Sequence, residues 1–252
     1  MPNDKHPFDV AAERLEALAD KPVAGQDASP DYWELRSATD ESVGDYPQAL
    51  LCEPHDWDES EGLGPDGFPA VPIPEQQLQP TARWTDVLSS SLWSEGHLLN
   101  QTALAVFKQC NLGDFREYPA IVSDHTGSAR PLTYLHVRNE IPPTAIDFER
   151  SEFYLAEMLG LPRGPVAIDS FEDWLEKQRR ASAGKLDGCE RFSRIAYKRL
   201  FFRRGHGPLV DLFRLARLGI TVYVSARLKN AIVSSGISGL EIKPNKRLFA
   251  DR

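Results

Sequence analysis

The stretch DLFRLARLGITVYVSARLKNAIVSSGISGLEI, residues 211–242, contains the clearest structural pattern in the chain. Its first half holds two largely apolar runs, 211–216 and 220–224, which are separated by Leu218-Gly219. Short apolar runs on either side of a glycine turn are typical of neighbouring β-strands. We therefore expect two strands in this half.

A helix and a closing strand are expected in the second half. Ser225 is a typical N-cap residue, and apolar side chains recur at helical spacing until Gly236, a residue type that commonly ends helices. The apolar run at 240–242 predicts the closing strand. The spacing places five side chains on one buried side: Val222, Val224, Leu228, Ile232 and Ile242.

Similar signals recur upstream. Residues 32–35 predict a short strand, and a helix with Ser94 as its N-cap is expected over 94–110. Residues 118–122 and 132–137 flank a Thr-Gly-Ser turn and predict a β-hairpin. Ser170 is expected to cap a further helix that runs into a basic segment.

These elements predict an α+β fold with mixed or antiparallel sheets and capped helices. The segments 93–122 and 224–242 share the order of capping serine, helix, glycine break and strand. This order suggests two weakly repeated strand–helix–strand halves. We expect an N-terminal helix and linker at 1–29, followed by one α+β domain at 30–252.

Charge is distributed unevenly along the chain, whose formal net charge is −8. Residues 1–62 contain 16 acidic and four basic side chains, a local charge of −12. Residues 38–80 are rich in acidic residues, glycine and proline and predict a long loop, because proline excludes a long helix. Such an acidic region is either a solvated face or a docking surface for a basic partner.

An aromatic residue lies inside this acidic loop. Trp57 is surrounded by carboxylates and is either an anchor for a partner or a residue that pins the loop to the core. As partner contacts, the charges would steer association and Trp57 would slow dissociation. The candidate partner-binding residues are Asp45, Asp56, Trp57, Asp58, Glu59 and Glu61.

A basic segment covers residues 177–204 and includes Tyr197, Phe201 and Phe202. Basic residues interleaved with aromatic ones occur in nucleic-acid-binding surfaces. A nucleic-acid-binding or regulatory module is therefore the alternative function, although the same pattern also fits a solvated face. The negative charge of the whole chain disfavours nucleic acid as the partner.

Motifs for catalysis, metals or cofactors are missing from the sequence. The six histidines form no HxH, HxxxH or HExxH pattern, and the three cysteines lie far apart. No phosphate-loop, dinucleotide-binding or nucleophile-elbow motif is found. We expect no enzymatic activity, no metal and no cofactor. An unrecognised hydrolase with a distant Cys/His pair is a further alternative.

Other features bear on location. The opening residues, MPNDKH, lack the basic and apolar regions of a secretory signal. The longest apolar stretch, 209–224, is interrupted by charges and falls short of the roughly 20 residues of a membrane helix. Sparse cysteines suit a reducing compartment. We expect a soluble, cytoplasmic protein with no membrane partner.

Several segments together carry a resemblance to a known family. They are DYWEL at 31–35, EYPA at 117–120, IDFERS at 146–151, VYVSARLKNA at 222–231 and GISGLEI at 236–242. In this order they resemble the class-eleven immunity proteins of bacterial polymorphic toxin systems, formerly a domain of unknown function. Ala226 stands where that family often has Glu. The resemblance covers roughly residues 30–245.

The resemblance implies a binding protein without catalytic residues. Such an immunity protein binds a toxin encoded by an adjacent gene and blocks its active site or a surface that the toxin needs. The partner implied here is a cognate toxin, delivered for example by a contact-dependent or type VI system. A basic toxin, such as a nuclease, would complement the acidic first quarter of the chain.

Overall fold

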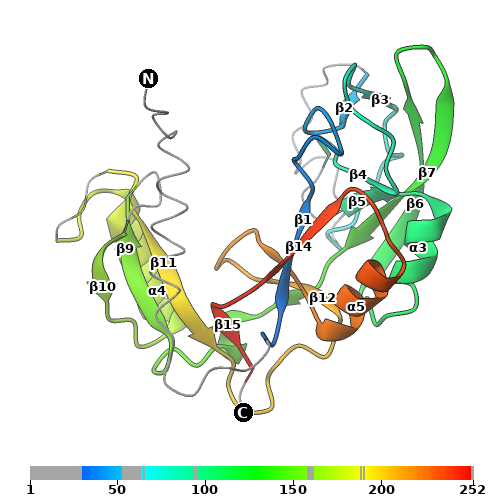
Figure 1. The fold of residues 1–252 in the computed structure, drawn as a ribbon. Coiled ribbons are helices and arrows are strands. Elements are labelled where there is room, and N and C mark those ends of the chain that lie inside the picture. Colours follow the sequence, from blue (N-terminus) through cyan, green and yellow to red (C-terminus); the bar gives the residue numbers. More distant parts are fainter. Residues whose placement is uncertain are drawn as a thin grey trace, which may run out of the picture.

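The computed structural model describes residues 30–52, 64, 66–92, 96–157, 162–187, 189 and 191–250 (Figure 1). These residues form an α+β fold with mixed sheets, which confirms the predicted class. The helix and linker expected at 1–29 lie outside them, and the proposed repetition of two halves stays a prediction. The elements are β1 (Trp33–Ser37), β2 (Ala49–Leu51), β3 (Gln76–Leu78), β4 (Val87–Leu88), β5 (Gly96–Leu99), α3 (Gln101–Phe107), β6 (Phe115–Ser123), β7 (Ala129–Val137), β8 (Glu140–Ile141), the 3-10 turn Pro143–Ala145, β9 (Glu152–Ala156), β10 (Pro162–Val166), α4 (Phe171–Ser182), β11 (Arg194–Phe201), β12 (Leu212–Leu215), β13 (Val222–Val224), α5 (Ala226–Ser234), β14 (Leu240–Pro244) and β15 (Leu248–Phe249).

A five-stranded sheet with the order β14-β1-β13-β12-β8 forms the centre of the molecule. β1 pairs antiparallel with β13, where Trp33 lies opposite Val224, and with β14 on its other side, where Trp33 lies opposite Pro244. β12 pairs antiparallel with β13 and parallel with β8. The predicted strand at 32–35 therefore lies between two strands of the C-terminal stretch.

A six-stranded sheet with the order β2-β3-β6-β7-β5-β4 curls back on itself. Its two ends meet just beyond β4, where Ala49 bridges to Ser90 and the Ala49 N–H donates to the Ser89 carbonyl at 3.0 Å. We call this sheet together with α3 the curled lobe. Its interior is apolar and contains Ala49, Ile73, Leu78, Leu88, Leu92, Leu98, Ala120, Val122, Leu132 and Tyr134.

The second lobe is inserted between two neighbouring strands of the central sheet. The chain leaves β8, forms β9, β10, α4 and β11, and returns at β12. The sheet of this lobe has the order β10-β9-β11-β15. Its last strand, β15, follows β14 in the chain and pairs parallel with β11, with Leu248 opposite Leu200. The C-terminal strand thus attaches the inserted lobe to the rest of the fold.

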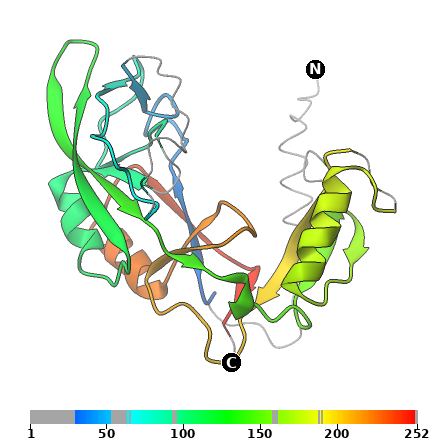
Figure 2. The same ribbon diagram turned by 180° about the vertical axis from the view of Figure 1, so that it is seen from behind.

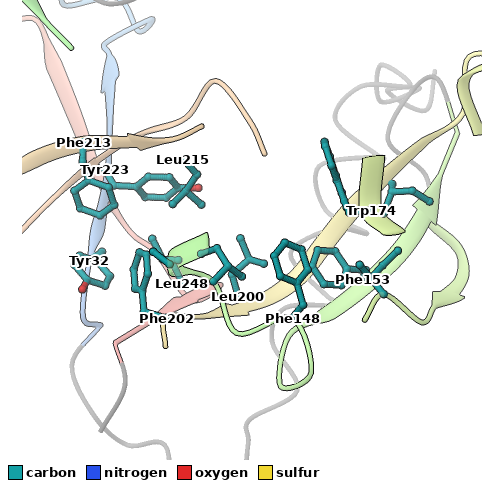
Figure 3. Close-up of a cluster of buried hydrophobic side chains, with 14 of the residues drawn as sticks. Tyr32, Phe148, Phe153, Trp174, Leu200, Phe202, Phe213, Leu215, Tyr223 and Leu248 are labelled. Atoms are coloured by element: carbon teal, nitrogen blue, oxygen red, sulfur yellow. The ribbon is translucent and has the colours of Figure 1, made fainter. Parts of the chain in front are cut away.

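Figures 1 and 2 show the curled lobe and the second lobe as two arms that diverge from the central sheet. One apolar core crosses from the central sheet into the second lobe, as Figure 3 shows. The Tyr32 and Phe213 rings, both on the central-sheet side, meet edge to face with centroids 5.3 Å apart. Further along lie Phe202, Leu248, Leu200, Phe148, Phe153 and Trp174. This continuous core joins the base of the second lobe to the central sheet.

The prediction for the C-terminal stretch is confirmed. β12 and β13 form the two strands, and the Ser225 hydroxyl accepts a hydrogen bond from the Leu228 N–H at 3.3 Å at the start of α5. Gly236 follows the helix with a φ of +63°, a conformation that suits glycine. Of the five side chains expected inside, Val224, Leu228 and Ile232 are buried, whereas Val222 and Ile242 are half-buried against the same core.

The predicted helix over 94–110 is wrong in its first part. Gly96–Leu99 form β5, which pairs with β7, and α3 begins only at Gln101. Asn100 caps it, because its side-chain oxygen accepts from the Ala103 N–H at 2.8 Å. Ser94 lies outside the described residues. Leu98 faces the curled-lobe interior and Leu99 faces the core with α3, so a strand buried on both faces resembled a helix in sequence.

The long loop expected at 38–80 also contains short strands. β2 and β3 pair antiparallel, with Leu50 opposite Gln77. Each has three residues, too few for an alternating pattern to be recognised. The hairpin expected at 118–122 and 132–137 is confirmed and is longer than predicted, since pairing extends to Phe115 opposite Val137.

Candidate functional site

Of the six candidate partner-binding residues, the structure describes Asp45. The other five, Asp56, Trp57, Asp58, Glu59 and Glu61, lie outside the described residues. The chain enters their segment from β2. The last residue before it, Cys52, is fixed by a hydrogen bond from its N–H to the Glu75 carbonyl at 3.2 Å. The acidic segment therefore follows directly in the chain from a strand of the curled lobe.

The loop between β1 and β2 is packed onto the curled lobe. Asp45 is half-buried, and its Oδ2 accepts from the Thr81 N–H at 3.1 Å. The preceding Gly44 has a φ of +76°, and a Cβ there would overlap the Thr81 carbonyl. Val43 is fully buried and its carbonyl accepts from the Arg83 N–H at 2.8 Å. This loop is therefore held in a defined conformation.

Tyr46 is the exposed aromatic residue of this loop. Its side chain is 56% exposed, beside Asp45 and close in sequence to the exposed residues Asp40 and Glu41. The Asp40 carboxylate accepts from the Ser42 N–H at 2.8 Å, and hydrogen bonds to Ser42 lower the pKa of Asp40. We call Asp40, Glu41, Asp45 and Tyr46 the acidic loop surface. It combines an exposed aromatic ring with three acidic side chains.

The sequence pattern did not indicate Tyr46 as a surface residue. The available signal was its position between Asp45 and Pro47 in a segment dense in acidic residues. Trp57 has the same surroundings and the larger ring, so it was selected instead. Whether a tyrosine faces the core or water depends on tertiary packing, which a short acidic loop does not reveal.

Three aromatic residues of the basic segment 177–204, Tyr197, Phe201 and Phe202, are engaged inside the fold. Phe202 is fully buried, and Phe201 stacks on Phe249 with ring centroids 5.0 Å apart. The hydroxyl of Tyr197 is hydrogen-bonded to that of Tyr223, and burial raises the pKa of both. None of these three rings is therefore a free stacking platform for bases, and this part of the alternative loses its support.

Part of the positive charge in the same segment is neutralised locally. Lys177 lies 2.8 Å from an Asp173 oxygen, and Arg199 lies 3.2 Å from a Glu152 oxygen. Arg179 pairs with Glu176 on the surface of α4. The basic segment therefore has two parts. Basic side chains along α4 and β11 are paired with carboxylates, and other basic side chains lie near the connection between these two elements.

A small hollow, with a volume of about 10 Å³, lies between the curled lobe and the central sheet. His97 lines it, and burial lowers the pKa of this histidine to about 4. Arg214 lies 3.3 Å from a Glu140 oxygen, and the Asn139 side chain donates to the Leu212 carbonyl at 2.8 Å. Arg214 and Asn139 thus attach β12 to β8 and to the connection that precedes β8.

Cys110 packs partly buried against the core shared by α3 and α5. Burial raises the pKa of its thiol, and the nearby Asp211 raises it further. Within the described ranges, no three His, Cys, Asp or Glu side chains gather as a metal site would require. No helix in those ranges is long and apolar enough to span a membrane.

Comparison of the sequence with models of known protein families gives no match, and comparison with curated proteins gives none either. The resemblance to class-eleven immunity proteins therefore stays a prediction from the sequence.

Proposed function

We propose that this chain is an immunity protein that neutralises a cognate toxin by binding it directly. The observation that carries the proposal is the acidic loop surface, where Tyr46 is 56% exposed among Asp40, Glu41 and Asp45. Aromatic residues commonly anchor protein interfaces, and like-charged rims steer an oppositely charged partner. The partner best suited to this surface is a basic protein.

The defined conformation of the loop between β1 and β2 supports this role. The Val43 carbonyl and the Asp45 carboxylate accept hydrogen bonds from backbone N–H groups and hold the loop in place before any partner arrives. A preorganised loop loses little conformational entropy when it binds, which favours the tight binding that self-protection needs. The acidic segment that contains Trp57 follows directly after β2 in the sequence and is proposed as a second set of contacts with the same toxin.

The test is co-expression with the toxin gene adjacent to this one in the genome. We expect the wild-type chain to rescue growth and to co-purify with the toxin. Reversal of Asp40 and Glu41 to Lys should slow association, with a larger effect at low salt, whereas Tyr46→Ala should speed dissociation. Asp56, Asp58, Glu59 and Glu61 reversed to Lys, and Trp57→Ala, test the adjoining segment in the same way.

A matched control reverses Asp114 and Glu149, which are exposed and lie in the curled lobe and the second lobe respectively. These changes should leave association unchanged. If the wild-type chain neither rescues growth nor binds the toxin, the proposed function is wrong. If it rescues but both acidic sets can be reversed without effect, the toxin docks on a different surface.

A further inference from the structure

The connection between α4 and β11 contains a phenylalanine in a strained, exposed position. Phe192 has a φ of +69° and is 63% exposed. Its N–H donates to the Ser182 carbonyl at 3.1 Å, which fixes it at the C-terminal end of α4. A bulky residue rarely adopts positive φ, and strain of this kind is concentrated at functional positions.

Two of the three residues after Phe192, Ser193 and Ile195, face the interior of the fold. Ser193 is 1% exposed, and its hydroxyl is buried without a hydrogen-bond partner among the described residues. Ile195 is buried as well, and its N–H donates to the Gln178 side chain at 2.7 Å. The fold thus accepts a strained backbone and an unsatisfied hydroxyl while it presents the Phe192 ring to solvent.

Four cations belong to this connection or to the ends of α4 and β11 that it joins. Arg180, Lys185, Arg191 and Arg194 are all exposed and make no ion pair with another described residue. The Arg191 guanidinium lies 5.6 Å from the centre of the Phe192 ring. We call these four residues and Phe192 the basic end. It differs from Lys177 and Arg199, whose charges are matched by carboxylates.

The basic end and the acidic loop surface lie at the same end of the molecule. In Figures 1 and 2, the α4–β11 connection and the β1–β2 connection are both on the parts of the two arms that point away from β15. One arm therefore carries exposed carboxylates with a tyrosine, and the other carries exposed cations with a phenylalanine.

We propose that the basic end docks an acidic face of the same toxin that the acidic loop surface binds through a basic face. This inference rests on the proposed function and deepens it, because it assigns the partner two faces of opposite charge. Contacts of opposite sign on two arms fix the orientation of a partner and repel one placed the wrong way round.

A protein suits the basic end better than a nucleic acid. Single-stranded nucleic acid is usually held by several aromatic rings along a basic groove, and Phe192 is the one exposed ring of the basic end. The carboxylates at the same end of the molecule repel a polyanion, and the chain carries a net charge of −8.

The experiment measures binding of the full chain to the toxin from the adjacent gene, together with growth rescue. The test variant is the triple reversal Lys185→Glu, Arg191→Glu and Arg194→Glu, and a second is Phe192→Ala. The matched control changes to Glu three other exposed cations that make no ion pair with another described residue, Arg130, Arg204 and Arg217. The control alters the net charge by the same amount at sites away from the basic end.

We expect the triple reversal to weaken toxin binding at least tenfold relative to the control, and Phe192→Ala to raise the dissociation rate severalfold. If the wild-type chain rescues growth and the triple reversal binds like the control, the basic end is not a toxin contact, although the proposed function stands. If the wild-type chain does not bind the toxin, both proposals fail. Binding of a labelled 20-nucleotide oligo(dT) that the triple reversal abolishes, with toxin binding unchanged, overturns the inference in favour of nucleic acid.

Discussion

The junction of the curled lobe with the central sheet differs from the outer end of the second lobe in how its polar side chains are paired. They are hydrogen-bonded within the fold at the junction and are left in solvent at the outer end. At the junction, the Asp86 carboxylate accepts from the Ser238 N–H at 2.9 Å and from the Asn100 side chain at 2.7 Å. The buried Asp211 accepts from the Asn111 N–H at 2.7 Å and from the Ser225 hydroxyl at 2.5 Å. Each carboxylate ties together segments that are remote in sequence.

At the outer end, Arg180, Lys185, Arg191 and Arg194 make no such ties to other described residues, and Phe192 is held in solvent. Polar groups that satisfy one another stabilise the fold, whereas groups left to water keep their capacity for a partner. The difference indicates that changes at the junction affect stability and that changes at the outer end affect binding.

The largest effect is expected in the core of the junction. Leu228 is fully buried between α5 and α3, and Leu228→Ala should lower the free energy of unfolding by about 2–5 kcal/mol because it leaves a cavity. Urea denaturation measures the change. Val233→Ala, at a position 59% exposed on the same helix, is the control and should stay within about 0.5 kcal/mol. Equal effects of the two substitutions would contradict the assignment of a rigid junction.

The second largest effect is a dependence of the free energy of unfolding on pH. The folded-state pKa of His97, about 4, lies below its unfolded value of about 6.5. As the pH falls below 6.5, the unfolded state binds a proton that the folded state does not, so stability is lost until about pH 4. The loss should approach 3 kcal/mol, at about 1.4 kcal/mol per pH unit.

His97→Gln should remove this dependence, which urea titrations at pH 7 and pH 4.5 would measure. His125→Gln and His206→Gln are controls at exposed positions. If their pH profiles change as much as that of His97→Gln, the hollow at the junction is not the source.

A smaller effect is expected at the Asp86 tie. Burial pushes the pKa of Asp86 up, but hydrogen bonds from Ser238 and Asn100 outweigh it and lower the pKa. Asp86→Ala should destabilise by about 1–2 kcal/mol. Ser238→Ala in the Asp86→Ala background should cause little further loss of stability, because both substitutions remove the same contact. Full additivity in a thermal double-mutant cycle would show that the two residues act independently.

The smallest effect has the opposite sign. Phe192→Gly should stabilise the fold by about 0.5–1 kcal/mol, because glycine adopts a φ of +69° without strain. The same variant should bind the toxin more weakly, which pairs a gain in melting temperature with a loss of affinity. A lower melting temperature would mean that the ring supports the fold, and the contrast between the two regions would weaken.

Sequence patterns predicted the elements whose signals are local. Ser225 and Ser170 cap α5 and α4 as expected, and Gly236 ends the C-terminal helix unit. Their side chains act within three or four residues of their own position, so the pattern alone is sufficient. The β6–β7 hairpin was predictable for the same reason.

Features that depend on remote contacts were not predictable. Gly96–Leu99 became a strand because β7 and β4 pair with it on either side. The exposure of Tyr46 and of Phe192 depends on packing of their loops against distant residues, and neither was selected from the sequence. In the candidate site, the acidic character of the region was readable, whereas the aromatic residue that accompanies the described carboxylates was not.

The position of β1 has a consequence for the order of events on the ribosome. Trp33 pairs with Val224 on one side and Pro244 on the other, so both partners of β1 are synthesised long after it. At about 5–20 residues per second, the strand waits on the order of ten seconds or more before they emerge. Leu35, which is buried in the finished sheet, has no strand to pair with during that time. The central sheet therefore cannot be completed until β13 and β14 have left the ribosome.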